Sequence, residues 1–176
     1  MTTYKPREIT KTLVESLENM PVVVLSGMRQ AGKSTLLLNQ PQLKGRRYIS
    51  FDDFNILEAA RSNPEELLAT KEPITIDEAQ KYPEILSVIK KEVDKNRKPG
   101  RFLLSGSANF LLLKKVAESL AGRAVYFTLY PFTRREMFGL TKEKPALAYF
   151  IDKGTFPKRE IKPILLQEIL KGGMRS

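Results

Sequence analysis

The sequence predicts an α/β protein of three layers, α/β/α, with helices on both faces of a central parallel sheet of five strands. Short apolar stretches alternate with helical patterns along the chain, which is typical of right-handed βαβ crossovers. The first of these stretches, residues 22–25, is apolar throughout, as parallel strands buried on both faces are. A glycine-bearing loop, residues 27–34, follows it directly.

The first half of the chain alternates between helix and strand patterns. Apolar residues at helical spacing predict a helix that Pro21 ends, and the β-branched run after it predicts a buried strand. Asn63 is a favoured helix cap and Pro64 suits the first helical position. In order, we expect a helix over 6–20, a strand over 22–25, a helix over 33–39, a strand over 46–51, a helix over 54–61, a helix opening at 63–66 and a strand over 73–77.

The second half begins in the same way and then becomes helical. Pro83 starts a helix with apolar residues at helical spacing, which ends near Gly100. We expect strands over 101–105 and 124–130 with a helix over 108–120 between them, and then helices over 133–138, 145–152 and 164–170. Residues 1–138 therefore form the expected α/β core, and residues 139–176 form a short helical C-terminal segment.

The composition excludes several classes of chemistry. The chain has no cysteine and no histidine, so zinc sites, thiolate nucleophiles and His-based triads are absent. Apolar runs stay far below the ~18 residues of a membrane span, and the N-terminus has no apolar signal stretch. We expect a cytoplasmic protein without a membrane partner, whose chemistry uses carboxylates, Lys, Arg, hydroxyls and a hard metal ion.

The charge is uneven along the chain, which has a net charge of +10. Residues 1–88 carry 11 Lys and Arg against 12 Asp and Glu, whereas residues 89–176 carry 19 against 8. A basic half can mark a surface for nucleic acid, but it can equally consist of solvated helix faces. No recognition-helix or aromatic signature accompanies the charge, so both interpretations stay open.

The loop after the first strand predicts a phosphate site. Residues 27–34 match the pattern G-x-x-x-x-G-K-[ST], in which glycines let backbone N–H groups point at phosphate oxygens. We expect Lys33 to reach the β- and γ-phosphates and the Ser34 hydroxyl to bind Mg²⁺, with ATP as the nucleotide. The alternative is a glycine turn with an incidental lysine. The expected nucleotide-binding residues are Gly27, Arg29, Gln30, Ala31, Gly32, Lys33, Ser34 and Thr35.

Two adjacent carboxylates end the expected strand over 73–77. In a phosphate-loop protein the first acid helps to hold magnesium beside the Ser hydroxyl, so we assign Asp77 to the metal. Glu78 is well placed to orient an attacking water as general base. The alternative is that the two acids only cap the following segment.

The spacing of the loop and the acids indicates a class of protein. A further strand and at least one helix lie between Lys33 and Asp77, which favours the class with an extra strand inserted, that of AAA-type ATPases. Kinases of small molecules more often carry their acids directly after the next strand. Asp52 and Asp53 follow that strand here, so the kinase alternative stays open.

Other polar residues are candidates for sensing or stabilising the γ-phosphate. Ser105, Ser107 and Asn109 follow or end the strand over 101–105, and any of them could report the presence of the γ-phosphate. The alternative is a plain Ser/Gly turn. Arg123 could stabilise transition-state charge in its own site or in that of a neighbouring subunit, or it could be a surface cation after a glycine helix stop.

These segments resemble the successive motifs of a widespread bacterial and archaeal family of AAA-type ATPases, from about residue 5 to 138: GMRQAGKSTLL, ITIDEAQKYPE, RFLLSGSANFLL, ESLAGRAV and LYPFTRRE. The resemblance implies a P-loop NTPase core over 1–138 with sheet order 5-1-4-3-2, and it supports the segment 105–107 as nucleotide sensor. It implies the roles given above for Lys33, Ser34, Asp77 and Glu78, and hydrolysis of ATP. Family members continue through a helical lid into a C-terminal domain, and residues 139–176 resemble the start of that region.

The function expected from these observations is Mg²⁺-dependent ATP hydrolysis that drives or switches an attached domain or partner, in a chain that could form a homo-oligomer. The alternative is an ATP/ADP-binding switch with little turnover, since AAA-type sites usually borrow an arginine from a lid or a neighbour. A small-molecule kinase is the third hypothesis.

Overall fold

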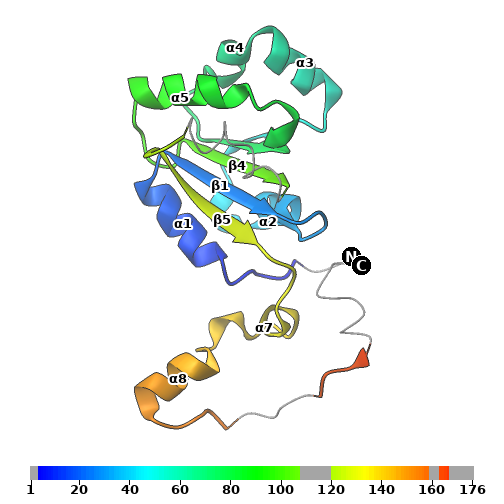
Figure 1. The fold of residues 1–176 in the computed structure, drawn as a ribbon, viewed down its shortest axis with the longest axis vertical. Coiled ribbons are helices and arrows are strands. Elements are labelled where there is room, and N and C mark those ends of the chain that lie inside the picture. Colours follow the sequence, from blue (N-terminus) through cyan, green and yellow to red (C-terminus); the bar gives the residue numbers. More distant parts are fainter. Residues whose placement is uncertain (1–3, 108–119, 159–162, 167–176) are drawn as a thin grey trace.

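Five parallel strands form one sheet at the centre of the computed structural model, which describes residues 4–107, 120–158 and 163–166 (Figure 1). The sheet order is β2-β3-β4-β1-β5, and every neighbouring pair is parallel. This confirms the expected order 5-1-4-3-2. The strands are β1 (Val22–Gly27), β2 (Arg47–Ser50), β3 (Ile74–Asp77), β4 (Phe102–Ser107) and β5 (Ala124–Leu129).

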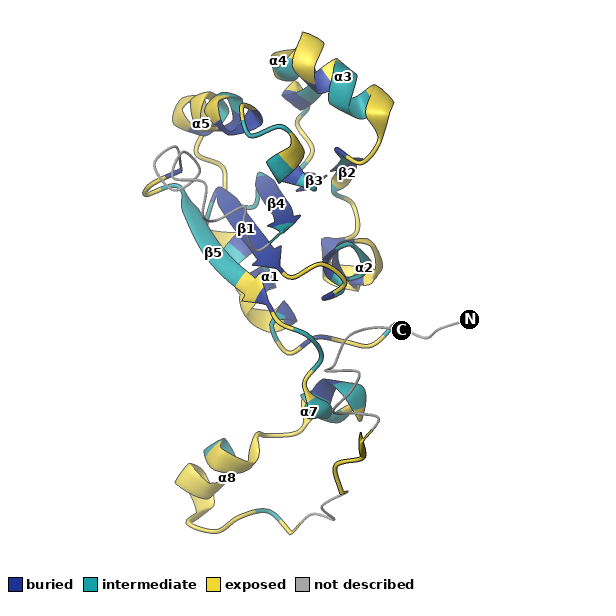
Figure 2. Ribbon diagram, turned by 45° about the vertical axis from the view of Figure 1, so that its right-hand side comes forward, coloured by how far each residue is buried: buried dark blue, intermediate teal, exposed yellow. Residues whose placement is uncertain are grey.

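Helices cover both faces of the sheet and give the three expected layers. Side chains of β1 alternate between the faces: Val22 and Val24 belong to one apolar core, and Val23 belongs to the other. The first core includes apolar residues of α3 (Phe54–Ser62), α4 (Pro64–Leu68) and α5 (Ile85–Lys95). The second includes those of α1 (Thr10–Asn19) and α2 (Lys33–Asn39). Figure 2 shows that the central strands β1 and β4 are buried between these helices, whereas β5 is mostly of intermediate exposure.

Two strands run further toward the phosphate loop than their apolar patterns predict. The apolar run of β1 ends at Leu25, but the strand continues to Gly27, whose partners are Ser107 of β4 and Leu129 of β5. Pairing on both sides therefore extends β1 through small polar residues.

The expected helix over 108–120 lies almost wholly outside the described residues, and so does most of the helix expected over 164–170.

The first helix begins later than its apolar spacing predicts, at Thr10 instead of residue 6. The residues before it form an irregular segment that ends in a turn at residues 8–9. The other predicted helices that lie within the described residues are present, most with boundaries shifted by one or two residues, but α5 ends at Lys95 and not near Gly100. Asn63 caps α4 by accepting a hydrogen bond from the Glu66 amide, which confirms the predicted cap. Short 3₁₀ helices are η1 (Pro41–Leu43), η2 (Ala79–Lys81) and η4 (Leu140–Lys142).

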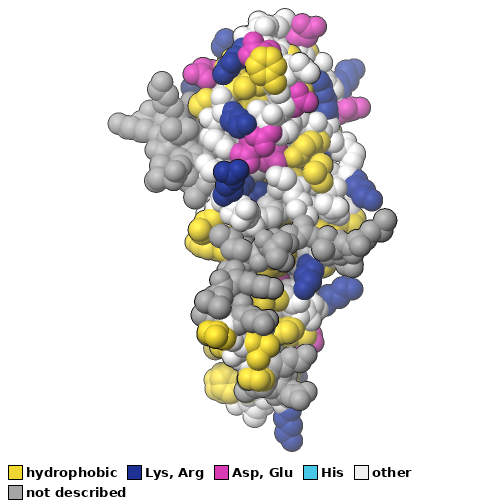
Figure 3. Space-filling view, turned by 90° about the vertical axis from the view of Figure 1, so that its right-hand side faces the viewer, with side chains coloured by type: hydrophobic (Ala, Val, Ile, Leu, Met, Phe, Trp, Pro, Cys, Tyr) yellow, Lys and Arg dark blue, Asp and Glu magenta, His cyan; other side chains and the backbone are white. Residues whose placement is uncertain are grey.

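The chain after β5 leaves the sheet and forms α7 (Arg134–Met137) and α8 (Ala146–Lys153). α7 begins with a capping box of Thr133 and Glu136, and α8 has no buried residue. Large apolar side chains are exposed on this part of the molecule (Figure 3), namely Phe138, Leu147, Phe150, Ile151, Phe156, Ile164, Leu165 and Leu166. Within the described ranges, no helix has the length and apolar character to cross a membrane.

Charged side chains of both signs are mixed on the face of the molecule shown in Figure 3. Lys and Arg side chains there lie among Asp and Glu side chains over the sheet and its helices. This arrangement is ordinary for a solvated surface.

Candidate functional site

The carboxyl ends of the parallel strands bring the predicted site residues to one edge of the sheet. Gly27 ends β1, Asp77 ends β3 and Ser107 ends β4. A cavity of about 680 Å³ opens at this edge, which is within the usual size of a small-molecule site. Its lining residues are Arg29, Gln30, Gly32, Lys33, Ser34, Thr35, Asp52, Glu78, Gln80, Lys81 and Ser107.

The phosphate loop, residues 27–34, has two residues in a backbone conformation that is typical of glycine. Gln30 and Gly32 have positive φ angles of 64° and 92°, and Gly32 is the cap residue from which α2 starts. Gly27 is required for a different reason: a Cβ atom there would lie 2.5 Å from the Leu129 carbonyl oxygen of β5. The loop can therefore leave the sheet only through a residue without a side chain.

Lys33 is folded over the loop that precedes it. Its ammonium group donates hydrogen bonds to the carbonyl oxygens of Gly27 and Met28, each across 3.1 Å, and only 6% of the residue is exposed. The side chain also lines the cavity. A buried ammonium held on neutral carbonyls is a strong binding point for an anion such as phosphate, because a charged acceptor strengthens its hydrogen bonds.

Asp77 lies at the centre of a hydrogen-bonded cluster. Its Oδ1 accepts from the Ser105 hydroxyl (2.5 Å) and from the Glu78 amide (3.1 Å), and its Oδ2 accepts from the Tyr48 hydroxyl (2.6 Å). The Ser34 hydroxyl lies close enough to Asp77 and Tyr48 to lower the pKa of both side chains. Burial alone would raise the pKa of Asp77, but these hydrogen bonds together hold it below the ordinary value, so the carboxylate stays ionised.

This cluster fits a magnesium ion. Ser34 and Asp77 come from different elements, α2 and β3, yet they are in contact, and both offer oxygen. Hydroxyl and carboxylate oxygens are the ligands that Mg²⁺ takes beside substrate phosphates. The Tyr48 hydroxyl fixes the second carboxylate oxygen, and both burial and this hydrogen bond raise the pKa of Tyr48, so it stays a donor.

Glu78 follows Asp77 in a strained conformation. Its φ angle is 55°, which is uncommon for a residue with a side chain and costs free energy. The Glu78 carboxylate lines the cavity and accepts a hydrogen bond from the Gln80 amide. The Gln80 side-chain oxygen accepts in turn from the Ser107 backbone amide at 3.3 Å. Gln80 thus joins the ends of β3 and β4 behind the Glu78 carboxylate.

The sensor candidates occupy different places. Ser105 is fully buried and donates to Asp77, and it is not among the residues that line the cavity. Ser107, two residues later in β4, does line the cavity. Asn109 lies outside the described residues.

Arg123 lies at the amino ends of the strands, away from the cavity at their carboxyl ends. It directly precedes β5, whose first residue Ala124 pairs with Val22 at the start of β1. Its guanidinium donates to both carboxylate oxygens of Asp94, at 2.6 and 3.0 Å. The structure therefore does not bring Arg123 to the cavity, because the parallel register places it at the amino ends of the strands.

The two acids behind the kinase alternative have other partners. The Asp53 side chain caps α3 by accepting from the amides of Asn55 and Ile56. Asp52 lines the cavity and forms an ion pair with Lys81, with 2.5 Å between their charged atoms.

Sequence reasoning missed Tyr48 and Gln80. Tyr48 lies in β2 on the same face as Ser50, the register partner of Asp77, so the alternation of that short strand was the available signal. Gln80 stands two residues after Glu78, but its contact depends on the turn that η2 makes.

Comparisons with known proteins agree with this geometry. A family model described as an AAA domain matches residues 19–138. Two uncharacterized proteins, from Mycobacterium tuberculosis and Mycobacterium bovis, are each 38% identical to this chain over 133 residues, which are 74% of this chain and 30% of each relative. The chain thus spans about a third of the length of the curated relatives that it matches.

Solved structures of similar fold include a Walker-type ATPase of Pyrococcus abyssi. It has a TM-score of 0.53 and 19% identity, and the match covers 76% of this chain and 55% of that chain. This likeness shows the fold. A shikimate kinase from Acinetobacter baumannii in complex with shikimate has a TM-score of 0.36 and 17% identity, over 76% of this chain and 70% of that chain, which is too low to bear on function.

Proposed function

The chain belongs to the AAA domain family, and on that premise we propose that it binds ATP with Mg²⁺ and hydrolyses the γ-phosphate. Nucleotide binding through a P-loop is the function that family and fold support. The observation that supports Mg²⁺ binding and hydrolysis is the closeness of Ser34 to Asp77, beside a cavity that Lys33 and Glu78 also line. An ammonium, a hydroxyl, an ionised carboxylate and a second carboxylate thus converge on one space.

Each group has a role in phosphate binding. The Lys33 ammonium exchanges loop carbonyls for β- and γ-phosphate oxygens, and the backbone amides of the phosphate loop add donors at the start of α2. Ser34 and Asp77 would hold the magnesium ion, which neutralises charge on the β- and γ-oxygens when bound. Tyr48 and Ser105 keep the Asp77 carboxylate ionised and oriented.

Glu78 is the proposed general base. Its carboxylate is on the cavity wall beside the magnesium ligands, and the Gln80 amide fixes one of its oxygens. The other oxygen can accept a proton from a water that attacks the γ-phosphorus. Because Gln80 also holds the Ser107 amide, Ser107 is the preferred candidate for sensing the γ-phosphate, and Ser105 is assigned to Asp77 instead.

Full turnover needs a cation that neutralises transition-state charge. Arg29 lines the cavity from the loop itself. Arg123 could serve the site of a neighbouring copy, since it stands on the far edge of the sheet. In the absence of such a copy the chain would act as an ATP/ADP-binding switch. The exposed apolar side chains on and around α8 support a contact with an attached domain or partner. Through this contact, either hydrolysis or the exchange of ATP and ADP would move that domain or partner.

The test is phosphate release from Mg-ATP by the wild-type chain and by Glu78→Gln, with Glu84→Gln as the matched control on the exposed start of α5. We expect Glu78→Gln to keep ATP affinity and to lower phosphate release by about 100-fold or more. Equal phosphate release by the wild type and by Glu78→Gln would refute the assignment of Glu78. Clear ATP binding without release in any protein would favour the switch.

A further inference from the structure

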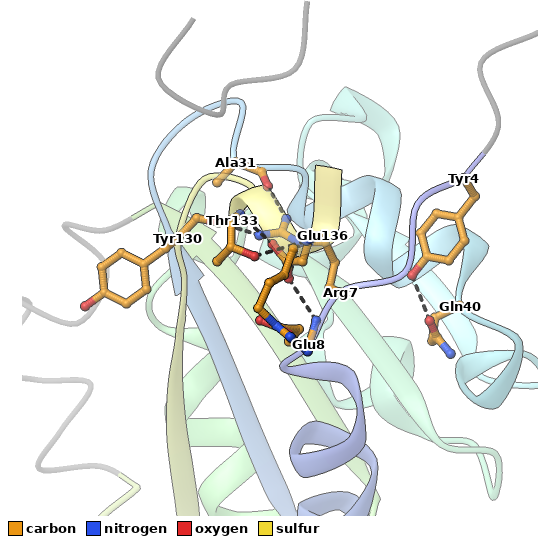
Figure 4. A network of polar contacts seen from close by, with 9 residues as sticks. Tyr4, Arg7, Glu8, Ala31, Gln40, Tyr130, Thr133 and Glu136 are labelled. Carbon is orange, nitrogen blue, oxygen red and sulfur yellow. Dashed lines mark hydrogen bonds and ion pairs between the residues drawn. The ribbon is translucent and has the colours of Figure 1, made fainter. Parts of the chain in front are cut away.

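Arg7 is a buried cation that lies behind the phosphate loop and outside its sequence motif. Only 5% of the residue is exposed, and it belongs to the irregular segment before α1. Its Nη1 donates to the Ala31 carbonyl oxygen across 2.8 Å (Figure 4). Arg7 does not line the nucleotide cavity, which Gly32 and Lys33 do.

The contact with Ala31 fixes the orientation of one peptide group in the loop. The chain has no cis peptide bond among its described residues, so the Ala31 C=O and the Gly32 N–H point in opposite directions. With the carbonyl held by Arg7, the Gly32 N–H points away from Arg7, toward the side where the residue lines the cavity. A Gly32 peptide has little resistance of its own to reorientation, since glycine lacks the side chain that restricts φ and ψ.

Arg7 is itself held by the segment that follows β5. Its Nη2 donates to the Tyr130 carbonyl oxygen (2.5 Å), its Nε lies 3.0 Å from Glu136 Oε1, and its guanidinium stacks on the Phe132 ring at 4.2 Å. Glu136 is equally buried, and the amides of Glu8 and Thr133 donate to its two oxygens (Figure 4). The guanidinium therefore has one orientation, and that orientation presents Nη1 to the loop.

A purely stabilising role would not explain this arrangement. Removing two charges from water is costly, and a buried ion pair is seldom more favourable than well-packed apolar side chains of similar volume. The guanidinium offers a fixed fork of donors that an apolar residue or a lysine cannot reproduce. Its particular contribution is to connect the peptide at Ala31 with the chain at Tyr130.

We propose that Arg7 is a positioning residue for triphosphate binding, which turns the Gly32 N–H toward the phosphates by holding the Ala31 carbonyl from behind. This inference rests on the proposed function, because it concerns the same loop. Without Arg7 the peptide is free to rotate, and the loop must be ordered by the nucleotide at the cost of affinity.

The test compares Arg7→Met with Arg46→Met by titration with Mg-ATP. Arg46 is the control because its guanidinium, like that of Arg7, donates hydrogen bonds to backbone carbonyls, here those of Gly100 and Ile74, and also to Thr75 Oγ1, at the opposite end of the strands. Both variants lose stability. Only Arg7→Met is expected to bind ATP about 10-fold or more weakly, and the Gly32 amide signal in its ¹H–¹⁵N spectrum should shift before nucleotide is added.

Arg7→Lys separates geometry from charge and serves as the test if Arg7→Met does not fold. Lysine keeps the charge beside Glu136 but has no planar fork, so it cannot hold Ala31 and Tyr130 together and ATP affinity should remain reduced. Wild-type affinity in Arg7→Lys, or equal losses in Arg7→Met and Arg46→Met, would overturn the inference. If the wild-type chain and Lys33→Ala both fail to bind ATP, it is the proposed function that fails.

Discussion

The Ser105 hydroxyl donates to Asp77 Oδ1 across 2.5 Å and thereby joins two neighbouring strands, β4 and β3, at the edge of the sheet where the nucleotide cavity opens. This contact changes the role that we assign to Ser105. A residue whose position in the motif suggested a sensor of the γ-phosphate is bonded instead to the proposed magnesium acid. Ser107, which lines the cavity, is the sensor that we propose instead.

Ser105→Ala should destabilise the protein more than a serine-to-alanine change in the adjacent strand. The hydroxyl is buried and bonded to a carboxylate, so its loss should lower the unfolding free energy by about 1.5–3 kcal/mol. Ser26→Ala is the control, because Ser26 is buried in β1 and donates to the neutral carbonyl of Phe127. Its cost should be about 0.5–1.5 kcal/mol. Urea unfolding of both variants measures the difference, and equal losses would contradict the account.

Asp77→Asn should make stability less dependent on pH in protein freed of metal by a chelator. The folded-state pKa of Asp77 lies below its ordinary value of 3.8, so the ionised carboxylate contributes stability that is complete above that value. This contribution is lost as the pH falls through the folded-state pKa. Urea titrations between about pH 7 and pH 3 should therefore show the wild type approaching the variant at the acidic end. A constant difference across the range would contradict the depressed pKa.

Tyr48→Phe should weaken the binding of Mg²⁺ at the nucleotide site. The variant keeps the ring in β2 but leaves Asp77 Oδ2 without the hydroxyl that orients it. We expect the Mg²⁺ concentration for half-maximal ATP binding to rise by about 10-fold or more, as for other residues that orient metal ligands. Tyr82→Phe, whose ring packs on Phe51, is a control that should bind Mg²⁺ like the wild type. An unchanged requirement in Tyr48→Phe would remove Tyr48 from the site.

Arg123→Ala should leave ATP affinity within about 2-fold of the wild type, because the side chain stands at the amino ends of the strands and pairs with Asp94. If Arg123 serves a neighbouring copy, the turnover per chain rises with protein concentration in the wild type and not in the variant. Arg97→Ala is the control at the same edge, where Arg97 donates to the Gly122 carbonyl. A large loss of ATP affinity in Arg123→Ala alone would contradict this placement.

Most of the fold could be predicted because its signals are local. The continuous apolar run of β1 indicates burial on both faces, and Asn63 with Pro64 marks the start of α4. The ends of strands were less accessible, since Ser26 and Gly27 extend β1 only through their pairing with β4 and β5. Those partners are distant in sequence, and no local pattern contains them.

The site shows the same division between local and distant information. The conformation of the phosphate loop and the positions of Lys33 and Ser34 follow from one motif of eight residues, 27–34. Tyr48, Ser105 and Arg7 act through contacts that span 29, 28 and 24 residues of sequence, so only the folded sheet brings them to their partners. The motif could not show where Arg123 lies, because a parallel register, and not nearness to a motif, decides the end of the strands at which a residue lies.

The central claim is that the phosphate loop binds a nucleoside triphosphate, and calorimetric titration of the chain with Mg-ATP tests it most directly. The wild type should bind one ATP saturably, and Lys33→Ala should bind it about 10- to 100-fold more weakly, because the variant loses the buried ammonium at the phosphates. Lys44→Ala, an exposed lysine away from the cavity, should bind like the wild type. Equal ATP affinity in the wild type and in Lys33→Ala would contradict the account.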